Sequence, residues 1–160
     1  MIIKKSIVIS FILVSFFAKS QTVSGVYKIN DLLNRIKSND TTYVINFWAT
    51  WCKPCVQELP AFDSLVTHSK IGSTKIILVS LDFKEDIVTK VNPFLQKNNI
   101  KCHVVLLDEI NGNDYINKIS EIWSGAIPAT LFKNKRNTNF IESKVNFNEL
   151  QKNIADVLQK

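Results

Sequence analysis

The sequence is poor in glycine and proline, with four of each among 160 residues, and it contains only three cysteines. So little glycine and proline, together with ten phenylalanines, excludes a collagen-like, linker-like or disordered chain. Three cysteines are too few for a disulfide scaffold, so a cysteine pair here indicates chemistry rather than cross-linking. With 46% apolar and 21% charged residues, the chain has the composition of one globular domain.

The sequence also lacks an apolar run long enough to cross a bilayer. Its longest, residues 7–17, has 11 residues, whereas a membrane-spanning helix needs about 20. The run follows two lysines and precedes Ala18-Lys19-Ser20, which places small residues before a cleavage point. We therefore expect residues 1–20 to be a signal peptide and residues 21–160 to form the domain, in an oxidising compartment such as a periplasm. An uncleaved membrane anchor is the alternative.

The net charge gives little indication of a partner. Without residues 1–20, 17 basic residues remain against 14 acidic ones, a net charge of +3. The densest basic stretch, Lys133 to Arg136, has four residues, whereas nucleic-acid binding requires a longer basic face with interleaved aromatic residues. We expect no nucleic-acid partner.

Apolar periodicity predicts strands that alternate with helices. The expected strands are 26–29, 43–48, 75–81, 102–107, 129–132 and 139–141. The first expected helix begins at residue 30, and the second follows Cys52 as far as His68. A third runs over 85–91 and restarts after a break at Asn92-Pro93. The last two cover 115–123 and 147–158. This alternation, which ends in a hairpin and a helix, predicts an α/β domain with a mixed sheet and helices on both faces.

The segment Trp51-Cys52-Lys53-Pro54-Cys55 lies between an expected strand and an expected helix. Cys52 would therefore lie at a helix N-terminus, where unpaired N–H groups and the helix dipole favour the thiolate. Lys53 adds a neighbouring cation, and Pro54 suits the first helical turn because its missing N–H is not needed there. A spacing of three residues lets Cys55 attack a mixed disulfide formed on Cys52.

Two other interpretations of this motif are weaker. A structural zinc site needs four ligands, and only His68, His103 and Cys102 could complete one. A static disulfide at this spacing closes a very small loop and adds little stability. Cys102 itself lies in an apolar strand and is expected to be a core residue, although an odd secreted cysteine can also pair between molecules.

The segment from Phe47 to Cys55, Phe-Trp-Ala-Thr-Trp-Cys-Lys-Pro-Cys, resembles the active-site segment of the thioredoxin superfamily, and in detail its secreted TlpA and ResA type thiol-disulfide oxidoreductases. Pro60 matches the proline within the family's active-site helix, and Gly125 to Thr130 is similar to its cis-proline loop. The resemblance implies a thioredoxin fold. Residues 85–107 then resemble a helix–strand insertion before the cis-proline strand.

The resemblance also implies a role for each site residue. Cys52 would be the attacking thiol and Cys55 the resolving thiol. Pro128 would follow a cis bond, the backbone of Ile127 would pair with a substrate strand, and Trp51 would flank the contact surface. From the residues alone, Ile127-Pro128 is an ordinary strand start.

One position departs from the pattern of cytosolic thioredoxins, which place a buried, proton-transferring aspartate where this chain has Asn46. Asn46 cannot titrate. Secreted relatives with the same departure use an acid elsewhere, so Asp82, Glu85 and Glu58 are candidates here. For each of them a solvated carboxylate is the alternative.

The resemblance predicts a secreted or periplasmic thiol-disulfide oxidoreductase that reduces disulfides of secreted proteins, for example apo-cytochrome c. It implies protein disulfide or dithiol substrates and a membrane-bound electron donor, and we expect a monomer with no metal and no organic cofactor. One alternative is an oxidase that donates its disulfide, since couples in this superfamily span about 150 mV. Another is a thioredoxin-fold chaperone that holds Cu(I) on Cys52 and Cys55.

Overall fold

The computed structural model describes residues 21–37, 40–68 and 72–159, so the signal peptide expected over residues 1–20 lies outside the described part. The described chain forms a six-stranded sheet in the order β1-β4-β3-β2-β5-β6. The strands are β1 (Val26–Tyr27), β2 (Thr42–Trp48), β3 (Thr74–Ser80), β4 (His103–Leu107), β5 (Ala129–Lys133) and β6 (Thr138–Ile141). β1 to β4 are mutually parallel where they pair, whereas β5 is antiparallel to both β2 and β6. The predicted mixed sheet is confirmed.

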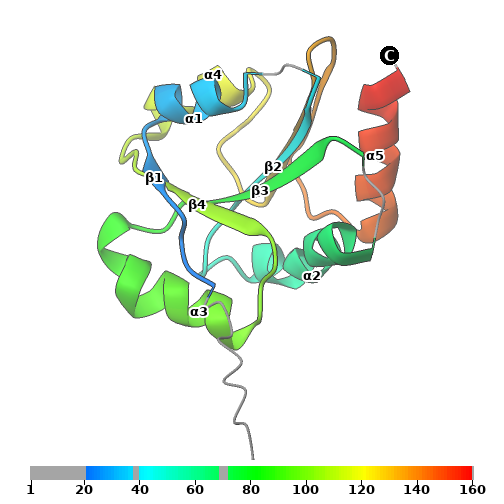
Figure 1. The fold of residues 1–160 in the computed structure, drawn as a ribbon. Coiled ribbons are helices and arrows are strands. Elements are labelled where there is room, and N and C mark those ends of the chain that lie inside the picture. Colours follow the sequence, from blue (N-terminus) through cyan, green and yellow to red (C-terminus); the bar gives the residue numbers. More distant parts are fainter. Residues whose placement is uncertain (1–20, 38–39, 69–71, 160) are drawn as a thin grey trace, which may run out of the picture.

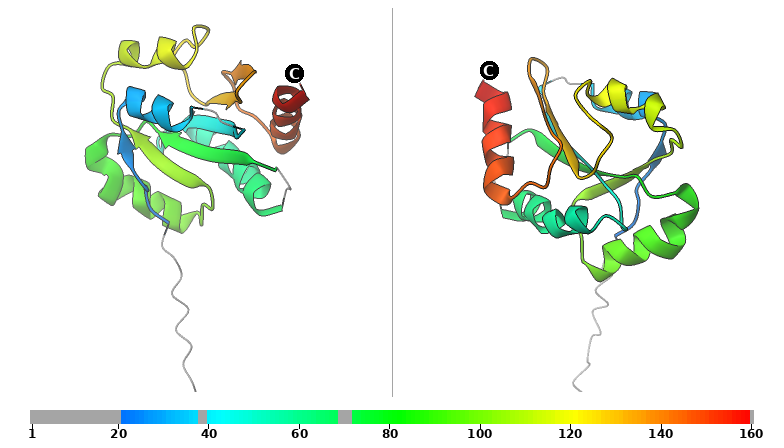
Figure 2. Two further views of the ribbon diagram at one scale, coloured as in Figure 1. Left: turned by 45° about the horizontal axis from the view of Figure 1, so that its top comes forward. Right: turned by 180° about the vertical axis from the view of Figure 1, so that it is seen from behind.

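Helices cover both faces of this sheet (Figure 1). They are α1 (Ile29–Arg35), α2 (Lys53–His68), the 3-10 turn η1 (Lys84–Asp86), the π-helix η2 (Ile87–Val91), α3 (Asn92–Lys97), the 3-10 turn η3 (Gly112–Asp114), α4 (Ile116–Ile119) and α5 (Phe147–Gln159). One face carries α1 and α4, and the other carries α2, α3 and α5, with α5 beside the β5–β6 hairpin (Figure 2). The predicted α/β fold with an inserted helix and strand, α3 and β4, before β5 is confirmed.

β2 lies at the centre of the sheet, and all seven of its residues are buried. Its composition of β-branched and aromatic residues suits a strand covered on both faces. Successive side chains point to opposite faces, so Val44 and Trp48 pack in the core beneath α2, whereas Ile45 and Phe47 pack in the core beneath α1. Asn46 shares the α2 face, which places a polar group beneath the helix that carries the cysteines.

The restart expected at Asn92-Pro93 is confirmed in part, because α3 begins at Asn92 with Pro93 in its first turn, but Asn92 does not cap the helix. Asn92 has helical backbone angles of −60° and −46°, and the chain passes from η2 into α3 without a gap. Pro93 lies in the first turn of α3, as expected. The Asn92 side chain does not cap a helix but accepts a hydrogen bond from the N–H of Val23, 2.8 Å away.

The helix expected over 115–123 is also shorter than predicted, since α4 ends at Ile119. The apolar residues beyond it are placed by aromatic packing rather than by helical periodicity. Trp123 stacks on Phe47 and Tyr115, with ring centroids 4.9 and 5.7 Å apart. At the C-terminus the predicted capping box is confirmed, because Asn146 and Glu149 exchange hydrogen bonds of 3.1 and 2.8 Å.

The topology brings three loops to one edge of the sheet. β2 and β3 are parallel, so their carboxyl ends lie side by side, and the N–H of Leu81 donates to the carbonyl of Trp48 at 2.8 Å. β5 runs antiparallel to β2, with Ala129 opposite Phe47, so the residues that precede β5 lie at the same edge. The motif after β2, the acid after β3 and the proline before β5 therefore meet.

Candidate active site

Cys52 and Cys55 form a disulfide at the start of α2, with an S–S distance of 2.01 Å. Cys55 is completely buried, whereas Cys52 retains 6% of its accessible surface. The difference arises because Cys52 precedes the helix and Cys55 lies within its first turn. Cys52 is thus the less buried of the two cysteines, and its role as the attacking thiol stays a prediction.

The start of α2 favours negative charge on the Cys52 sulfur. The N–H of Cys55 points at this sulfur from 3.3 Å, and the first turn contains no acidic residue. An N–H donor at the positive end of a helix stabilises a thiolate relative to a thiol. Lys53 and Pro54 are both exposed on the same turn, so Lys53 adds a cation at the surface rather than a buried contact.

The Ile127–Pro128 peptide bond is cis, as the resemblance predicts. The carbonyl oxygen of Ile127 lies 3.7 Å from the sulfur of Cys52, although the two residues are 75 positions apart. Pro128 is buried and Ile127 is half-buried, whereas Trp51 on the other side of the disulfide is 68% exposed. The sequence motif and the proline loop are thus brought together, with an exposed tryptophan beside them.

Two residues that the sequence did not indicate hold this proline loop. Glu142 accepts hydrogen bonds from the N–H groups of Ser124 and Ala126, both at 3.0 Å. A hydrogen bond from the Ser124 hydroxyl, and then these two backbone bonds, hold the pKa of Glu142 below its usual value. The ring N–H of Trp123 donates to the carbonyl of Ala126 at 2.8 Å. The Glu142 contacts join segments 16 and 18 residues apart, whereas the Trp123 contact is made within the loop itself.

Asp82 fixes the loop that leads into Cys52. Its carboxylate accepts hydrogen bonds from the N–H of Thr50 at 3.0 Å, from the Thr50 hydroxyl at 2.5 Å and from the Ser80 hydroxyl at 2.8 Å. The side chain is almost entirely buried, with 4% of its surface exposed. All of these bonds stabilise a carboxylate, so Asp82 acts as an anchor for the loop.

Glu58 lies on the buried face of α2, one turn after Cys55, and 2% of its surface is exposed. Its two carboxyl oxygens accept from the side-chain amide of Asn46 at 2.7 Å and from the N–H of Val145 at 2.8 Å. Burial raises the pKa of Glu58 from 4.5 to about 7, against the lowering effect of these hydrogen bonds and of the positive charge on Lys144. Glu58 therefore changes its charge close to neutral pH.

Asn46 connects Glu58 to the start of β5. Its amide nitrogen donates to Glu58 and also to the Thr130 hydroxyl at 3.1 Å. The amide oxygen of Asn46 is buried and has no hydrogen-bond partner among the described residues. Asn46 thus supports the titrating Glu58, although the Asn46 amide carries no titratable proton.

The remaining candidates lie elsewhere. Glu85 is exposed on η1, and His103 lies at the start of β4, the opposite end of the strands from the disulfide. Cys102 is buried, as expected for a core residue, and burial raises its pKa far above the usual range. Within residues 21–37, 40–68 and 72–159, no three His, Cys, Asp or Glu side chains gather as a metal site requires. Nor does any helix of those residues have the length and apolar character to span a membrane.

Comparisons with known proteins agree with the fold. The profile of the AhpC/TSA family matches residues 16–138. The sporulation thiol-disulfide oxidoreductase A of Bacillus subtilis is 33% identical over 63 residues, which are 39% of this chain and 38% of that protein. The thiol-disulfide oxidoreductase ResA of Oceanobacillus iheyensis is 44% identical over 45 residues, 28% of this chain and 23% of the relative. The matches thus span well under half of these curated relatives.

A solved structure extends this similarity over most of the domain. The thioredoxin-related protein of Neisseria meningitidis serogroup B superposes with a TM-score of 0.66 over 76% of this chain and 88% of its own, at 22% identity. At this identity the superposition establishes the fold. The thioredoxin fold that the motifs predict is therefore confirmed.

The anchoring role of Asp82 predicts a loss of stability when its charge is removed. Asp82→Asn replaces one carboxylate oxygen, which accepts hydrogen bonds, by an amide group that donates them. The donors of Thr50 and Ser80 would then face another donor. We expect the free energy of unfolding to fall by about 2 kcal/mol, the size of one or two hydrogen bonds to a charged group. Urea denaturation measures this, with the exposed Asp31→Asn as a control expected to stay within about 0.5 kcal/mol of wild type. Equal losses in both variants would contradict the anchoring role.

The raised pKa of Glu58 predicts a pH-dependent stability. Between about pH 4.5 and 7 the folded protein holds a proton on Glu58 that the unfolded chain releases, so stability falls as pH rises. Relative to Glu58→Gln, the wild type should lose about 3 kcal/mol of unfolding free energy over this interval. Urea denaturation of both proteins at several pH values measures the difference. Two parallel curves would show that Glu58 titrates normally.

Proposed function

The chain belongs to the AhpC/TSA family and has the thioredoxin fold, and from this premise we propose that it is a thiol-disulfide oxidoreductase whose reacting groups are Cys52 and Cys55. One observation carries the proposal: a cysteine pair at a helix N-terminus, of which Cys52 is the less buried member and lies beside a cis-proline loop. The names of the relatives, both thiol-disulfide oxidoreductases, support it.

The proposed reaction transfers two electrons to a substrate disulfide. The Cys52 thiolate attacks one substrate sulfur, so a Cys52–substrate bond forms, the substrate S–S bond breaks and the other substrate sulfur leaves as a thiolate that takes a proton. The Cys55 thiolate then attacks the Cys52 sulfur, forms the Cys52–Cys55 disulfide and releases the second substrate thiol. An external dithiol must return the two electrons before the next cycle.

Glu58 is the acid best placed to exchange a proton with Cys55. It lies three residues beyond Cys55 on α2, and so on a neighbouring face of the same helix. Its burial and its pKa near 7 allow it to accept a proton from the resolving thiol at neutral pH. Asp82 is occupied by hydrogen bonds from Thr50 and Ser80, and Glu85 is exposed, so both are weaker candidates.

We further propose that the protein acts as a reductase of disulfides in secreted proteins, for example apo-cytochrome c. A substrate strand would pair with the backbone of Ile127, and the exposed Trp51 would contact the substrate beside its cysteine. The proposed signal peptide over residues 1–20 would direct the monomeric domain, residues 21–160, out of the cytoplasm. In an oxidising compartment a membrane-bound donor would reduce the cysteine pair.

The different exposures of the two sulfurs predict which variant traps a substrate. When reduced protein is mixed with insulin as a disulfide probe, Cys55→Ser should accumulate a covalent adduct that resists denaturant and disappears with dithiothreitol. Cys52→Ser should form none, because the accessible nucleophile is missing. Cys102→Ser serves as the control and should reduce insulin at the wild-type rate, since Cys102 is buried away from the site. The absence of an adduct in both active-site variants would refute the proposal.

The role of Glu58 predicts how the resolving step depends on pH. Reduced protein should release thionitrobenzoate from dithiobis(nitrobenzoate) in two phases, attack by Cys52 and then resolution by Cys55. Because the Glu58 carboxylate accepts the Cys55 proton, the second phase should accelerate as pH rises through about 7.

In Glu58→Gln the second phase should be about 100-fold slower at pH 7, the usual contribution of a general base, and should rise only near the free thiol pKa of about 8.5. Stopped-flow absorbance resolves the two phases, and Glu85→Gln, which changes an exposed acid, is the matched control. An unchanged pH profile of the second phase in Glu58→Gln would assign the proton transfer to another group.

A further inference from the structure

A cavity of about 550 Å³ lies at a step in the edge of the sheet. β3 begins at Thr74, but β4 begins at His103, which pairs with Ile77. Within the described residues, Thr74 to Ile76 therefore have no neighbouring strand on that side, and Figure 1 shows β3 extending beyond the start of β4. The cavity occupies this step and is bounded by α1 and by the two-residue strand β1.

The cavity is well separated from the disulfide. Thr74 lies at its wall, whereas the opposite end of β3 leads to Asp82 and the active-site loop. β3 has seven residues, and a strand rises about 3.3 Å per residue, so the two sites are about 20 Å apart. A molecule in the cavity would leave the Cys52 sulfur accessible.

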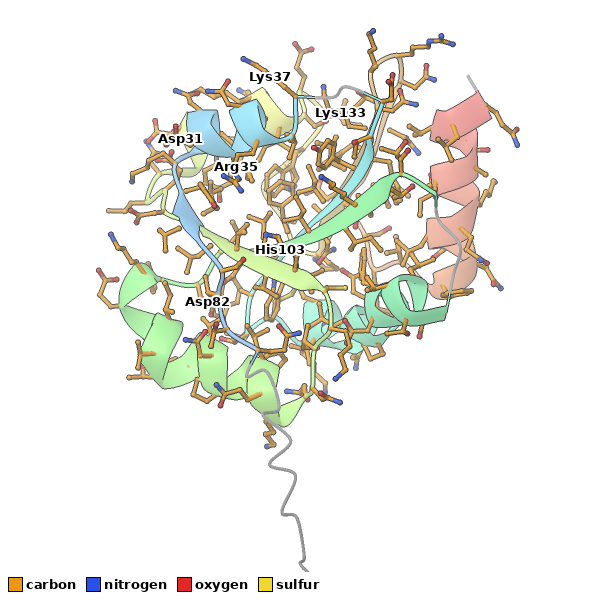
Figure 3. All side chains as sticks on the ribbon, viewed as in Figure 1. Asp31, Arg35, Lys37, Asp82, His103 and Lys133 are labelled. Atoms are coloured by element: carbon orange, nitrogen blue, oxygen red, sulfur yellow. A yellow bond between two sulfur atoms is a disulfide. The ribbon has the colours of Figure 1, made fainter. Side chains whose placement is uncertain are left out.

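The mouth of the cavity is cationic. Arg35, Lys75, Lys101 and His103 are exposed residues that line it, and none of the described lining residues is acidic. Arg35 extends from α1 toward the sheet edge that carries His103 (Figure 3). The ion pairs within 4.0 Å among the described residues involve Lys28, Lys84 and Lys90, so the three cations of the mouth, Arg35, Lys75 and Lys101, have no acidic partner at that distance.

His103 is a neutral polar group of the mouth at pH 7 rather than a fourth cation. Burial, and then the positive charge of Arg35, lower the pKa of His103 from 6.5. Arg35 also lies over the ring of Tyr27, with its guanidinium carbon 4.8 Å from the ring centroid. Like charges that converge on a concave surface raise the local potential and attract an anion.

The floor of the cavity is apolar and holds one unsatisfied polar atom. Leu32, Tyr43, Ile76 and Val105 line it and are buried. The hydroxyl oxygen of Thr74 is buried without a hydrogen-bond partner among the described residues. A pocket of several hundred Å³ with apolar walls and a few convergent polar groups is typical of small-molecule sites.

We propose that this cavity binds a small organic anion, whose carboxylate or phosphate group contacts the cationic mouth and whose apolar body packs on the floor. The charge of the mouth selects the anion, and the buried side chains select a molecule with apolar surface over an inorganic ion. The Thr74 hydroxyl is available to donate to such a ligand.

The test uses the oxidised full chain with anilinonaphthalene sulfonate, an aromatic anion, and with N-phenylnaphthylamine, its uncharged analogue. Fluorescence titration should show that the anion binds at least about tenfold more tightly than the analogue, and that salt weakens only the anion. The double variant Arg35→Gln with Lys75→Gln should weaken the anion about tenfold, as expected for two exposed charge contacts. The control Lys97→Gln changes an exposed residue of α3 outside the cavity, and its affinity for the anion should stay within about twofold of wild type.

Amide spectra with the dye bound should change at Thr74, Lys75 and His103. Changes confined to the amides of Trp51 and Phe83, whose rings are exposed, would place the dye at the disulfide and overturn the proposal. Equal affinity for the two dyes, or a double variant within about twofold of wild type, would also overturn it. If a hexaglutamate peptide binds more tightly than the anionic dye, and if this binding depends on Arg35, the ligand is an acidic protein segment and the proposal of a small anion is wrong.

One variant separates this inference from the proposed enzyme. Cys52→Ser lacks the reacting sulfur but leaves the cavity unchanged, so it should bind the anionic dye as wild type does. The double variant should in turn reduce insulin normally, because neither Arg35 nor Lys75 contacts the site. Loss of dye binding in Cys52→Ser would show that the dye reports on the disulfide instead.

Discussion

The central constraint in this structure is the burial of β2 between a parallel and an antiparallel neighbour. Because β3 is parallel, Asp82 at its end reaches the loop that follows β2 and binds Thr50. Because β5 is antiparallel, Pro128 precedes it at the same edge and brings the Ile127 carbonyl to 3.7 Å from the Cys52 sulfur. One central strand thus assembles the candidate active site from three distant segments.

The same strand supports the group that titrates near neutral pH. Asn46 faces α2 from within β2 and binds Glu58, which the helix places one turn beyond Cys55. A charge buried this deeply is costly, and the two hydrogen bonds to Glu58 offset only part of that cost, so the acid remains protonated to about pH 7. The titrating group is therefore on the helix, and Asn46 on the strand supports it through an uncharged side chain.

The features that could be predicted from the sequence are those that depend on residues close together in the chain. The Cys52–Cys55 spacing, the strand through Asn46 and the capping box of Asn146 and Glu149 all follow local rules. Glu142 and the cationic cavity could not be predicted, because their contacts join segments far apart in the chain. The helix over 115–123 was overpredicted, since aromatic packing of Trp123 on Phe47 produces the same apolar spacing without helical backbone.

The direction of electron flow is the central claim, and the reduction potential of the Cys52–Cys55 pair tests it most directly. Equilibration of the purified protein with glutathione or dithiothreitol mixtures, followed by thiol alkylation and mass measurement, gives the fraction that is reduced. A reductase that is supplied by a membrane donor requires a potential near −270 mV, about that of thioredoxin. A potential near −120 mV would mean that the protein donates disulfides, and would contradict the account.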